Sequence, residues 1–567
     1  MYIKVTKSGP RRYVQLVEGY RGEDGKVRQR TIASLGRLEV VGEQVDSIIK
    51  GLQRVTGREV ASSTQPSQPL DILFQPAKAL GDSWVLDCIW HDLGFDRLDK
   101  ALNASGKRKH SVEQLLKVMV FNRLCDPTSK LGISRWLERA TVPGIDPEAV
   151  THQRLLRAMD ALIENRVQLD KTLSSLLRPL IDIDLAVVFY DLTTVRAEGL
   201  AEQDEDIRKY GRSKDGGVRK QFVLGVVQTA EGLPIFHQVF EGNVAEVTTL
   251  KSSLEEVMSR FPIRRVVAVA DRGLMSTHNL DELREIKTPS GEPLEFILAV
   301  PGRRYGEFTA LLEPMQRTHF ANVTEETLAE TAWDGLRLVV AYNPKKAAEQ
   351  TAERDAKIKA LEDQADDWAE QLDAQDQGTK KRGRPLSDGG ARAKFYHRVL
   401  ENKLGNIIKV DMKSELFSYT VDRKARRLAE LNDGKLLLVT NVPDLSPADI
   451  VNRYKALADI ERGFRVLKSE LEIGPVHHRL PDRIRAHAQI CFIALILHRV
   501  LRQRLKASGA QASPERALEQ LKSIQYHRVE IGGHQHSGIT TLAAEHQALL
   551  ASLNTPKPPK AEQLLLM

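Results

Sequence analysis

The stretch that decides the fold runs from Ser446 to Leu471, SPADIVNRYKALADIERGFRVLKSEL. Serine is a favoured N-cap residue, proline is tolerated in the turn that follows, and an early aspartate faces the positive end of the helix dipole. The pattern therefore predicts one long helix over 446–471. Apolar residues recur at helical spacing and predict a buried stripe made of Ile450, Leu457, Ile460, Phe464, Leu467 and Leu471.

Three polar side chains lie at the edge of this stripe. Tyr454, Glu461 and Lys468 are seven residues apart, which is nearly two helical turns, so they project from one side at intervals of roughly 10 Å. A carboxylate beside a buried stripe is a poor way to stabilise a core. The arrangement instead suits a carboxylate that binds a metal ion, flanked by two groups that contact phosphate.

Two aspartates follow predicted buried strands. Ala186–Tyr190 is an apolar run that ends at Asp191, and Arg265–Ala270 is a second run that ends at Asp271. The ends of neighbouring strands converge in space, so acids that are far apart in sequence can meet. We therefore expect Asp191, Asp271 and Glu461 to form one cluster.

The segments around these runs predict the rest of a sheet. Asp182 and Asp184 precede the first run and are expected in a turn. A four-residue turn, Thr229–Gly232, joins two further predicted strands. Around these runs we expect the strands Gln221–Gln228, Leu233–Phe240 and Glu295–Val300 and the helix Val247–Arg260. Elsewhere we expect strands over residues 1–37, Leu336–Tyr342, Leu416–Val421 and Lys435–Thr440, and a helix over His152–Leu177. A short heptad seam is expected at Ile358, Leu361, Ala365, Trp368 and Leu372.

The helix and the three acids together resemble a large group of bacterial insertion-sequence transposases. Their signature helix reads Tyr-x2-Arg-x3-Glu-x6-Lys, and Tyr454, Glu461 and Lys468 match it in identity and spacing. Leu457 stands where the signature has arginine, so that phosphate contact is missing or is supplied by Arg453 or Arg465. The resemblance implies a DDE transposase with an RNase-H-like core, of the branch that carries an insertion before the catalytic glutamate.

The resemblance also implies the metal chemistry. Asp191, Asp271 and Glu461 would be both the catalytic residues and the metal ligands. Two Mg²⁺ ions about 4 Å apart stabilise charge on the attacking and leaving oxygens of a phosphodiester and lower the pKa of the attacking water. Asp191 would bridge the two ions and each of the other acids would hold one, and Mn²⁺ is expected to substitute for Mg²⁺.

The expected fold class is α/β, with an RNase-H-like catalytic core interrupted by a mixed strand and helix insertion. A small N-terminal β unit and a helical N-terminal domain precede this core. The expected domains are a basic β-rich unit (1–60), a helical domain that binds DNA ends (75–180), the first part of the core (181–301), an insertion with a coiled-coil-like arm and a basic linker (302–443), the second part of the core (444–510), and a C-terminal region with a disordered tail (511–567).

Several basic or aromatic residues are expected to contact DNA. The loop Tyr210–Gly217 is basic and glycine-containing, and the resemblance implies a similar loop near the cleaved strand; its alternative is a surface hairpin. Lys380–Pro385 contains Arg-Gly-Arg-Pro, which resembles the core of a minor-groove hook but also suits a solvated linker. The expected DNA-contacting residues are Tyr454, Lys468, Arg465, Arg212, Lys214, Lys220, Arg382 and Arg384.

Composition agrees with a nucleic-acid partner without requiring one. The chain has 567 residues, a net charge of +7 and a pI of about 9.0. Its three cysteines make neither a zinc spacing nor a disulfide framework, which suggests a reducing compartment. The longest apolar run, Ile490–Leu497, is too short to span a bilayer and is expected to be a buried helix. A cytoplasmic protein with no membrane partner, associated with the nucleoid when bound to DNA, is therefore expected.

The expected function is that of a transposase which binds the terminal inverted repeats of its own element. It would pair the two ends as a homodimer, cleave them with Mg²⁺ and join the 3′-hydroxyls to target DNA. Two alternatives remain open at this point: a stand-alone RNase-H-like nuclease, and a catalytically inactive DNA-binding protein derived from a transposase. The long insertion disfavours the first, and the intact acid triad disfavours the second.

Overall fold

The structure is a computed structural model, and it divides into two compact units, Met1–Leu73 with Glu530–His534 and Phe74–Val529 with Gln535–Met567. The residues that the structure describes are 2–22, 27–38, 72–103, 110–181, 186–199, 206–213, 216–244, 246–261, 265–270, 280, 283–288, 291–378 and 386–559.

The first unit holds a three-stranded antiparallel sheet made of β1 (Tyr2–Ser8), β2 (Arg11–Arg21) and β3 (Val27–Arg37). Alternating residues and the Gly9-Pro10 turn specify these strands, and Val14 and Val17 of the central strand are buried. The strands predicted over the first 37 residues are confirmed.

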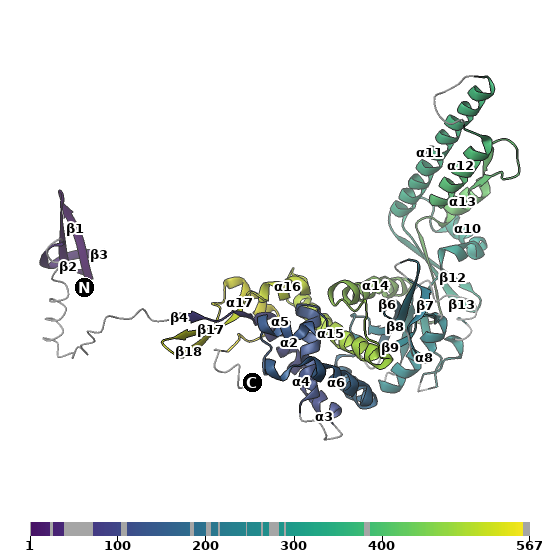
Figure 1. Cartoon of the computed structure of the whole chain (residues 1–567). Helices are drawn as coiled ribbons and strands as arrows, with labels where there is room; N and C mark the ends of the chain where they lie inside the picture. Colours follow the sequence, from purple (N-terminus) through teal and green to yellow (C-terminus); the bar gives the residue numbers. More distant parts are fainter. Residues whose placement is uncertain are drawn as a thin grey trace. The chain divides into compact units, whose positions relative to one another are not determined.

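The second unit is organised around one mixed sheet, to which nine of the described strands belong (Figure 1). Its order is β12-β13-β16-β11-β10-β6-β8-β7, and β9 pairs with β8. Strands β6, β10 and β11 are parallel, and the other pairings are antiparallel. The bounds are β6 (Ala186–Arg196), β7 (Lys209–Arg212), β8 (Val218–Thr229), β9 (Pro234–Glu241), β10 (Val266–Ala270), β11 (Glu295–Ala299), β12 (Thr327–Trp333), β13 (Leu336–Tyr342) and β16 (Lys435–Thr440).

The segment between β11 and the helix of the opening stretch contributes three strands to this same sheet. β16 pairs with β11 through Ile297↔Thr440, and β13 and β12 extend the sheet beyond it. The strands predicted over 336–342 and 435–440 are confirmed to the residue. The strand predicted over 416–421 is shorter than expected, because only β15 (Tyr419–Val421) pairs with β14 (Ile408–Val410).

Each face of the sheet is covered by a different helix. Strand residues alternate between faces, and the alternation divides β10 and the part of β6 that pairs with it. Phe189, Val267 and Val269 pack in one cluster with Leu457 of α14 (Pro447–Arg465), whereas Val188, Tyr190, Val266 and Ala268 join the main core with residues of α8 (Glu246–Arg260). Positions 189, 267 and 269 therefore belong to the face that α14 covers. Helix α14 lies beside the sheet in Figure 1.

A group of helices packs around α15 (Pro481–Ala507), which contacts β9 as well. Its helices are α2 (Gly81–Asp92), α3 (Leu98–Leu102), α4 (Val112–Cys125), α5 (Gly132–Arg139), α6 (His152–Glu164), α7 (Arg166–Leu177) and α16 (Pro514–Leu521). α15 is long and apolar enough to cross a membrane, but 94% of its most apolar stretch is buried inside the protein. It is therefore a core helix, as its sequence predicted.

The predicted extent of one helix in this group is wrong. The sequence predicts a continuous helix over 152–177, but the chain forms α6 and α7 with a break at Asn165. The Asn165 side chain donates to the carbonyl of Ala161 at 2.9 Å and to that of Leu102 at 3.4 Å, which terminates α6. Side-chain amides that bond to nearby backbone compete with helix continuation in this way.

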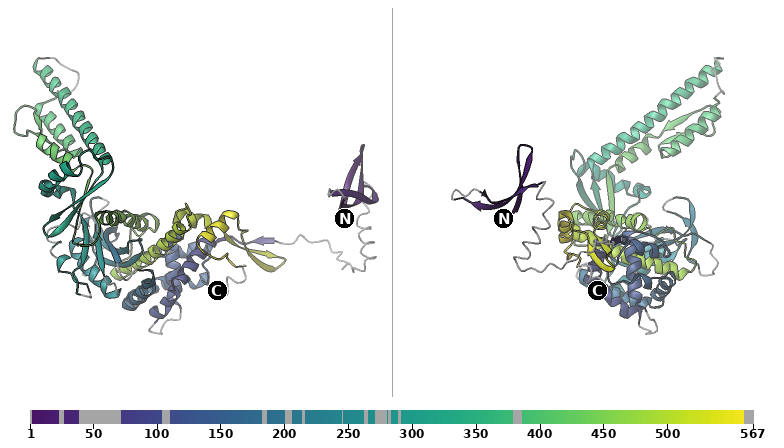
Figure 2. Two further views of the ribbon diagram at one scale, coloured as in Figure 1. Left: turned by 180° about the vertical axis from the view of Figure 1, so that it is seen from behind. Right: turned by 60° about the vertical axis from the view of Figure 1, so that its left-hand side comes forward.

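Helices α11 (Pro344–Asp376) and α12 (Asp388–Glu401) lie side by side as a helical arm (Figure 2). The predicted seam of α11 is buried at Ile358, Leu361 and Ala365, against Phe395 and Val399 of α12. The apolar seam therefore packs within its own chain. α10 (Thr309–Thr318) and α13 (Arg423–Asn432) pack against each other.

The chain ends in a smaller sheet and a last helix. Its strands are β17 (Gln525–Ile531), β18 (His534–Ile539), β4 (Ile72–Phe74) and β5 (Lys78–Ala79). Within the second unit, β17 pairs with β5, and α17 (Ala544–Ser552) contacts α16. The link between Lys78–Ala79 and Gln525–Tyr526 joins segments from opposite ends of the chain.

Candidate active site

The opening stretch forms the helix that its sequence predicts, with one change near its end. Ser446 caps α14 by accepting from the backbone of Asp449 at 3.1 Å. The stripe is buried as expected at Ile450, Leu457, Phe464, Leu467 and Leu471. The side chain of Ile460 lies outside the described set.

The sequence predicts an α-helix that continues to Leu471, but the α-helix is shorter. It ends at Arg465 and is followed by a π-helical turn, η6 (Val466–Glu470), in which Leu471 N donates to Val466 O at 2.9 Å. The wider turn keeps Val466, Leu467 and Leu471 buried together. Lys468 lies in this turn, so its spacing from Tyr454 is no longer that of a regular α-helix. Single π-helical turns are frequent at functional sites.

The sequence predicts Asp191 at the exit of its strand, but the structure places Asp191 inside the strand. β6 continues to Arg196 because Leu192, Thr193, Thr194 and Val195 are good strand formers and pair with β8. On the other side of β6, the last register pair with β10 among the described residues is Tyr190↔Ala270. Position 191 follows this pair directly in β6.

The side chains of all three acids lie outside the described set. Asp271 follows Ala270 directly in the chain and lies outside the described residues. Glu461 is in α14, and Asp191 is in β6, but their side chains are outside the described set. The positions of the three acids thus rest on backbone register and periodicity.

Residues of α14 near Glu461 show which side of the helix packs against the sheet. Tyr454 is half-buried against the cluster that contains Phe189 and Val267. Leu457 is only 4% exposed in the same cluster, which explains why an apolar residue can replace the signature arginine. Leu457 has no access to phosphate. Arg453 is half-buried, whereas Arg465 is exposed.

Gly463 marks the closest approach of α14 to its neighbours. A Cβ atom there would lie 2.7 Å from Arg499 Nη2 and 3.3 Å from both amide atoms of Gln228. Gln228 is fully buried and is the cross-strand partner of Phe189, and its amide atoms have no hydrogen-bond partner among the described residues. α14 therefore crosses the sheet over the Phe189–Gln228 pair, two residues before position 191.

Replacing Gly463 with Ala is expected to destabilise the protein. Overpacking a closed site costs about 1–3 kcal/mol, which exceeds the about 1 kcal/mol that alanine gains over glycine in a helix. Urea unfolding measures the difference. Gly389→Ala is the matched control, because this helical glycine is exposed and its nearest neighbour is 3.8 Å away. An equal gain in stability for both variants would contradict the close approach.

The predicted DNA-contacting residues have different surroundings. Lys220 Nζ donates to the carbonyl of Gly199 at 3.0 Å, Arg465 is exposed, and Lys468 is half-buried. Arg212 is in β7 with its side chain outside the described set, and Lys214, Arg382 and Arg384 lie outside the described residues. Tyr210 of β7 and Val218, the first residue of β8, are each 71% exposed.

A buried ion pair that the sequence did not suggest contacts the segment that follows η6. Arg208 donates from Nε to both carboxylate oxygens of Asp206 at 2.9 Å, and the two side chains are 1% and 3% exposed. Burial alone would raise the pKa of the Asp206 carboxyl, but the hydrogen bonds from Arg208 hold this pKa below its usual value. Arg208 also donates to the carbonyls of His478 and Arg479, so the pair fastens the segment that follows η6.

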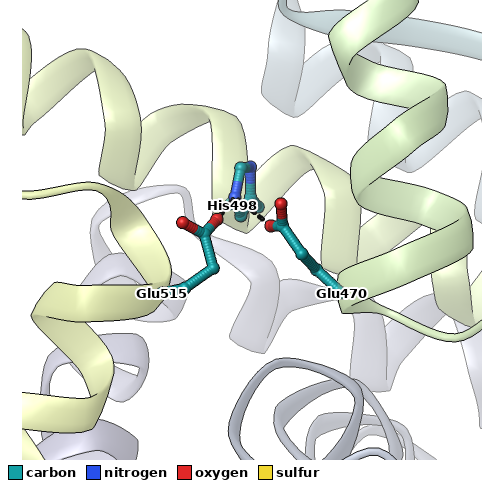
Figure 3. Close-up of side chains that lie close together, drawn as sticks. All are labelled: Glu470, His498 and Glu515. Carbon is teal, nitrogen blue, oxygen red and sulfur yellow. Dashed lines mark hydrogen bonds and ion pairs between the residues drawn. The ribbon is translucent and has the colours of Figure 1, made fainter.

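A second group missed from the sequence joins η6 to two later helices (Figure 3). His498 of α15 lies between Glu470, the last residue of η6, and Glu515 in the first turn of α16. Nothing in the sequence indicates this group, since its members come from three separate segments and the histidine lies in an apolar helix.

Two family models match the chain. Residues 184–497 match the transposase DDE domain, which is more than half of the sequence, and residues 3–66 match the N-terminal domain of IS1634 family transposases. The chain therefore belongs to the DDE transposases. More particularly, it is an insertion-sequence DDE transposase, so it is an enzyme whose partner is DNA and whose family implies a divalent metal ion.

Comparisons beyond these models add little. No curated protein matches the sequence. Among solved structures, a chain of the piggyBac transposase synaptic complex with hairpin DNA is similar over 78% of this chain and 79% of its own, with 9% sequence identity and a TM-score of 0.35.

Proposed function

We propose that this transposase binds the terminal inverted repeats of its insertion sequence, cleaves the ends with Mg²⁺ and joins the 3′-hydroxyls to target DNA. The proposal is supported by the backbone register of β6 and β10 and by the packing of α14, which together favour one face of the sheet for three acidic positions. Asp191, Asp271 and Glu461 are the proposed catalytic residues.

Strand register supports a pairing of the two aspartates. Tyr190 and Ala270 are the last register partners of β6 and β10, and Asp191 and Asp271 are the next residues of the two segments. Adjacent strands lie about 4.8 Å apart. Both aspartates also have odd numbers, like Phe189 and Val269, which belong to the face covered by α14.

Helix geometry supports the same face for the glutamate. Leu457, four residues before Glu461, packs with Phe189 and Val267. Gly463, two residues after it, approaches Gln228, the cross-strand partner of Phe189. Position 461 lies between these two points of contact, above the strand that carries Asp191.

The proposed core is RNase-H-like. Its support is the strand order β9-β8-β6-β10-β11, with β6, β10 and β11 parallel and α8 between β9 and β10 in the chain. Because β12, β13 and β16 extend the sheet, the segment 302–443 is an insertion in sequence that is built onto the core. The other domain bounds given above remain proposals.

Three carboxylates form a donor set that suits Mg²⁺, which prefers oxygen ligands and retains several waters and substrate phosphates. Asp191, Asp271 and Glu461 would hold two ions, with Mn²⁺ as a substitute. When bound, such ions stabilise developing charge at the cleaved phosphodiester and activate the attacking water. Aspartates at the end of β10 and within β6 would fix the ligand positions through the rigid sheet.

The remaining residues are proposed to hold DNA. Arg465 is exposed just beyond Glu461 and would replace the phosphate contact that Leu457 lacks. Tyr454, Lys468, Arg212, Lys214, Lys220, Arg382 and Arg384 complete the proposed set. A homodimer that pairs two ends and a cytoplasmic location, at the nucleoid when DNA is bound, belong to the same proposal.

The test is cleavage of a labelled duplex that carries one end of the element, compared with a duplex in which the end is scrambled. The full chain is expected to cut the first duplex at the end when Mg²⁺ or Mn²⁺ is present, and to stop when EDTA removes the metal. Cutting both duplexes equally would favour a general nuclease. Binding without cutting would favour an inactive DNA-binding descendant.

A further inference from the structure

The group formed by Glu470, His498 and Glu515 lies apart from the three proposed catalytic acids. His498 Nε2 is 2.7 Å from Glu515 Oε1 and 3.2 Å from Glu470 Oε2 (Figure 3). One ligand atom from each residue lies within 4.8 Å of the others. The 2.7 Å contact is a hydrogen bond. Small side-chain shifts would bring the three donor atoms to the distances that ligands of one cation have.

The two carboxylates of this group need a compensating positive charge, which a proton on His498 or a metal ion would supply. The histidine side chain is only 4% exposed, and two carboxylates face the same ring nitrogen. Glu470 Oε2 is buried and accepts no hydrogen bond of good geometry, although His498 Nε2 is near. Two carboxylates held together in a partly buried site repel unless a proton or a metal ion lies between them.

A small cavity reaches the same carboxylates from outside. Its volume is about 190 Å³, and four acids line it, namely Asp82, Glu470, Glu515 and Glu519, with Lys522 as the one basic residue of the lining. Asp82 is 2% exposed, and burial raises the pKa of its carboxyl. The cavity is thus lined mainly by acidic side chains, and Glu470 and Glu515 are among them.

We propose that Glu470, His498 and Glu515 bind one Zn²⁺ ion. An imidazole nitrogen with two carboxylates suits Zn²⁺, whereas Mg²⁺ takes oxygen ligands in near-ideal octahedral geometry. The ion would fasten the π-helical turn after the catalytic helix to α15 and α16. It is a structural site, distinct from the Mg²⁺ ions proposed at Asp191, Asp271 and Glu461.

A protonated histidine is the competing way to supply the positive charge. Burial lowers the pKa of His498, but hydrogen bonds with Glu470 and Glu515 outweigh it and raise this pKa above its usual value. If the proton alone balances the carboxylates, added Zn²⁺ does not bind there. Metal binding by the full chain therefore separates the two accounts.

The experiment titrates Zn²⁺ into chelator-treated full-length protein by calorimetry and follows the melting temperature in the same samples. All samples carry Asp191→Asn, which weakens metal binding at the proposed catalytic acids. We expect one Zn²⁺ ion per chain and a higher melting temperature with Zn²⁺. Glu515→Gln, which removes one ligand, is expected to weaken Zn²⁺ binding by about 100-fold or more.

Glu519→Gln is the matched control, because Glu519 lines the same cavity on α16 but is outside the group of three. With Glu519→Gln added, the Asp191→Asn protein is expected to bind Zn²⁺ with unchanged affinity. The proposal is overturned if the Asp191→Asn protein does not bind one Zn²⁺ ion per chain. It is also overturned if the Glu515→Gln and Glu519→Gln variants bind Zn²⁺ with equal affinity. Circular dichroism checks folding, and His498→Gln repeats the test if the Glu515 variant does not fold.

Discussion

Replacing Asp191 with Asn is expected to reduce the rate of DNA-end cleavage by about a thousandfold or more. The substitution keeps the size of the side chain and removes the charge that a metal ligand needs. Metal ions contribute several kcal/mol of transition-state stabilisation, and about 4 kcal/mol corresponds to a factor of roughly 1000 in rate. Single-turnover cleavage of an end-bearing duplex measures the effect.

The fold should survive this change, because β6 is held by its backbone pairs with β8 and β10. Asp184→Asn is the control, since Asp184 lies seven residues earlier and was expected in a turn. Wild-type cleavage by Asp191→Asn would remove Asp191 from the proposed site. Equal losses in both variants would point to a general effect on this segment.

Replacing Asp206 with Ala is expected to lower the free energy of unfolding by about 3–5 kcal/mol, because it leaves the buried Arg208 guanidinium unpaired. Burial and the hydrogen bonds from Arg208 act on the Asp206 pKa in opposite directions, and the net pKa lies below its usual value. The pair therefore stabilises the protein above the unfolded pKa of about 3.9, and this contribution is lost as pH falls through the folded pKa.

Urea unfolding at neutral pH measures this loss. Asp482→Ala removes the partner of Arg485 in a far more exposed ion pair, whose side chains are 64% and 32% exposed. It is expected to change stability by less than about 1 kcal/mol. If the two variants lose the same stability, Asp206 and Arg208 do not form the buried support described above. A lower cleavage rate for Asp206→Ala is also expected, because the segment after η6 would be released.

Local pattern predicted the elements with strong signals. The strands over 336–342 and 435–440 are runs of leucine, valine and other strand formers, and the structure reproduces both bounds. The stripe of α14 was predicted because its spacing and its serine cap agree. The position of Asp191 was predicted less well, since the end of an apolar run is not the end of a strand when threonine and valine follow.

Contacts between distant segments could not be predicted from local pattern. Asn165 ends α6 through its own side chain, which a helical period does not reveal. Arg208 forms an ion pair with Asp206, two residues earlier in the chain. It also donates to the carbonyls of His478 and Arg479, which only the fold brings close. The π-helical turn and the group around His498 depend on how α15 and α16 pack against η6.

The most direct test of the central claim compares Glu461→Gln with the wild type on an end-bearing duplex with Mg²⁺, measuring binding and cleavage in the same samples. The account predicts that the variant folds and binds the duplex as the wild type does, yet leaves the strand uncut. Cleavage at the wild-type rate would show that Glu461 is not the third metal ligand and that α14 does not carry the catalytic acid.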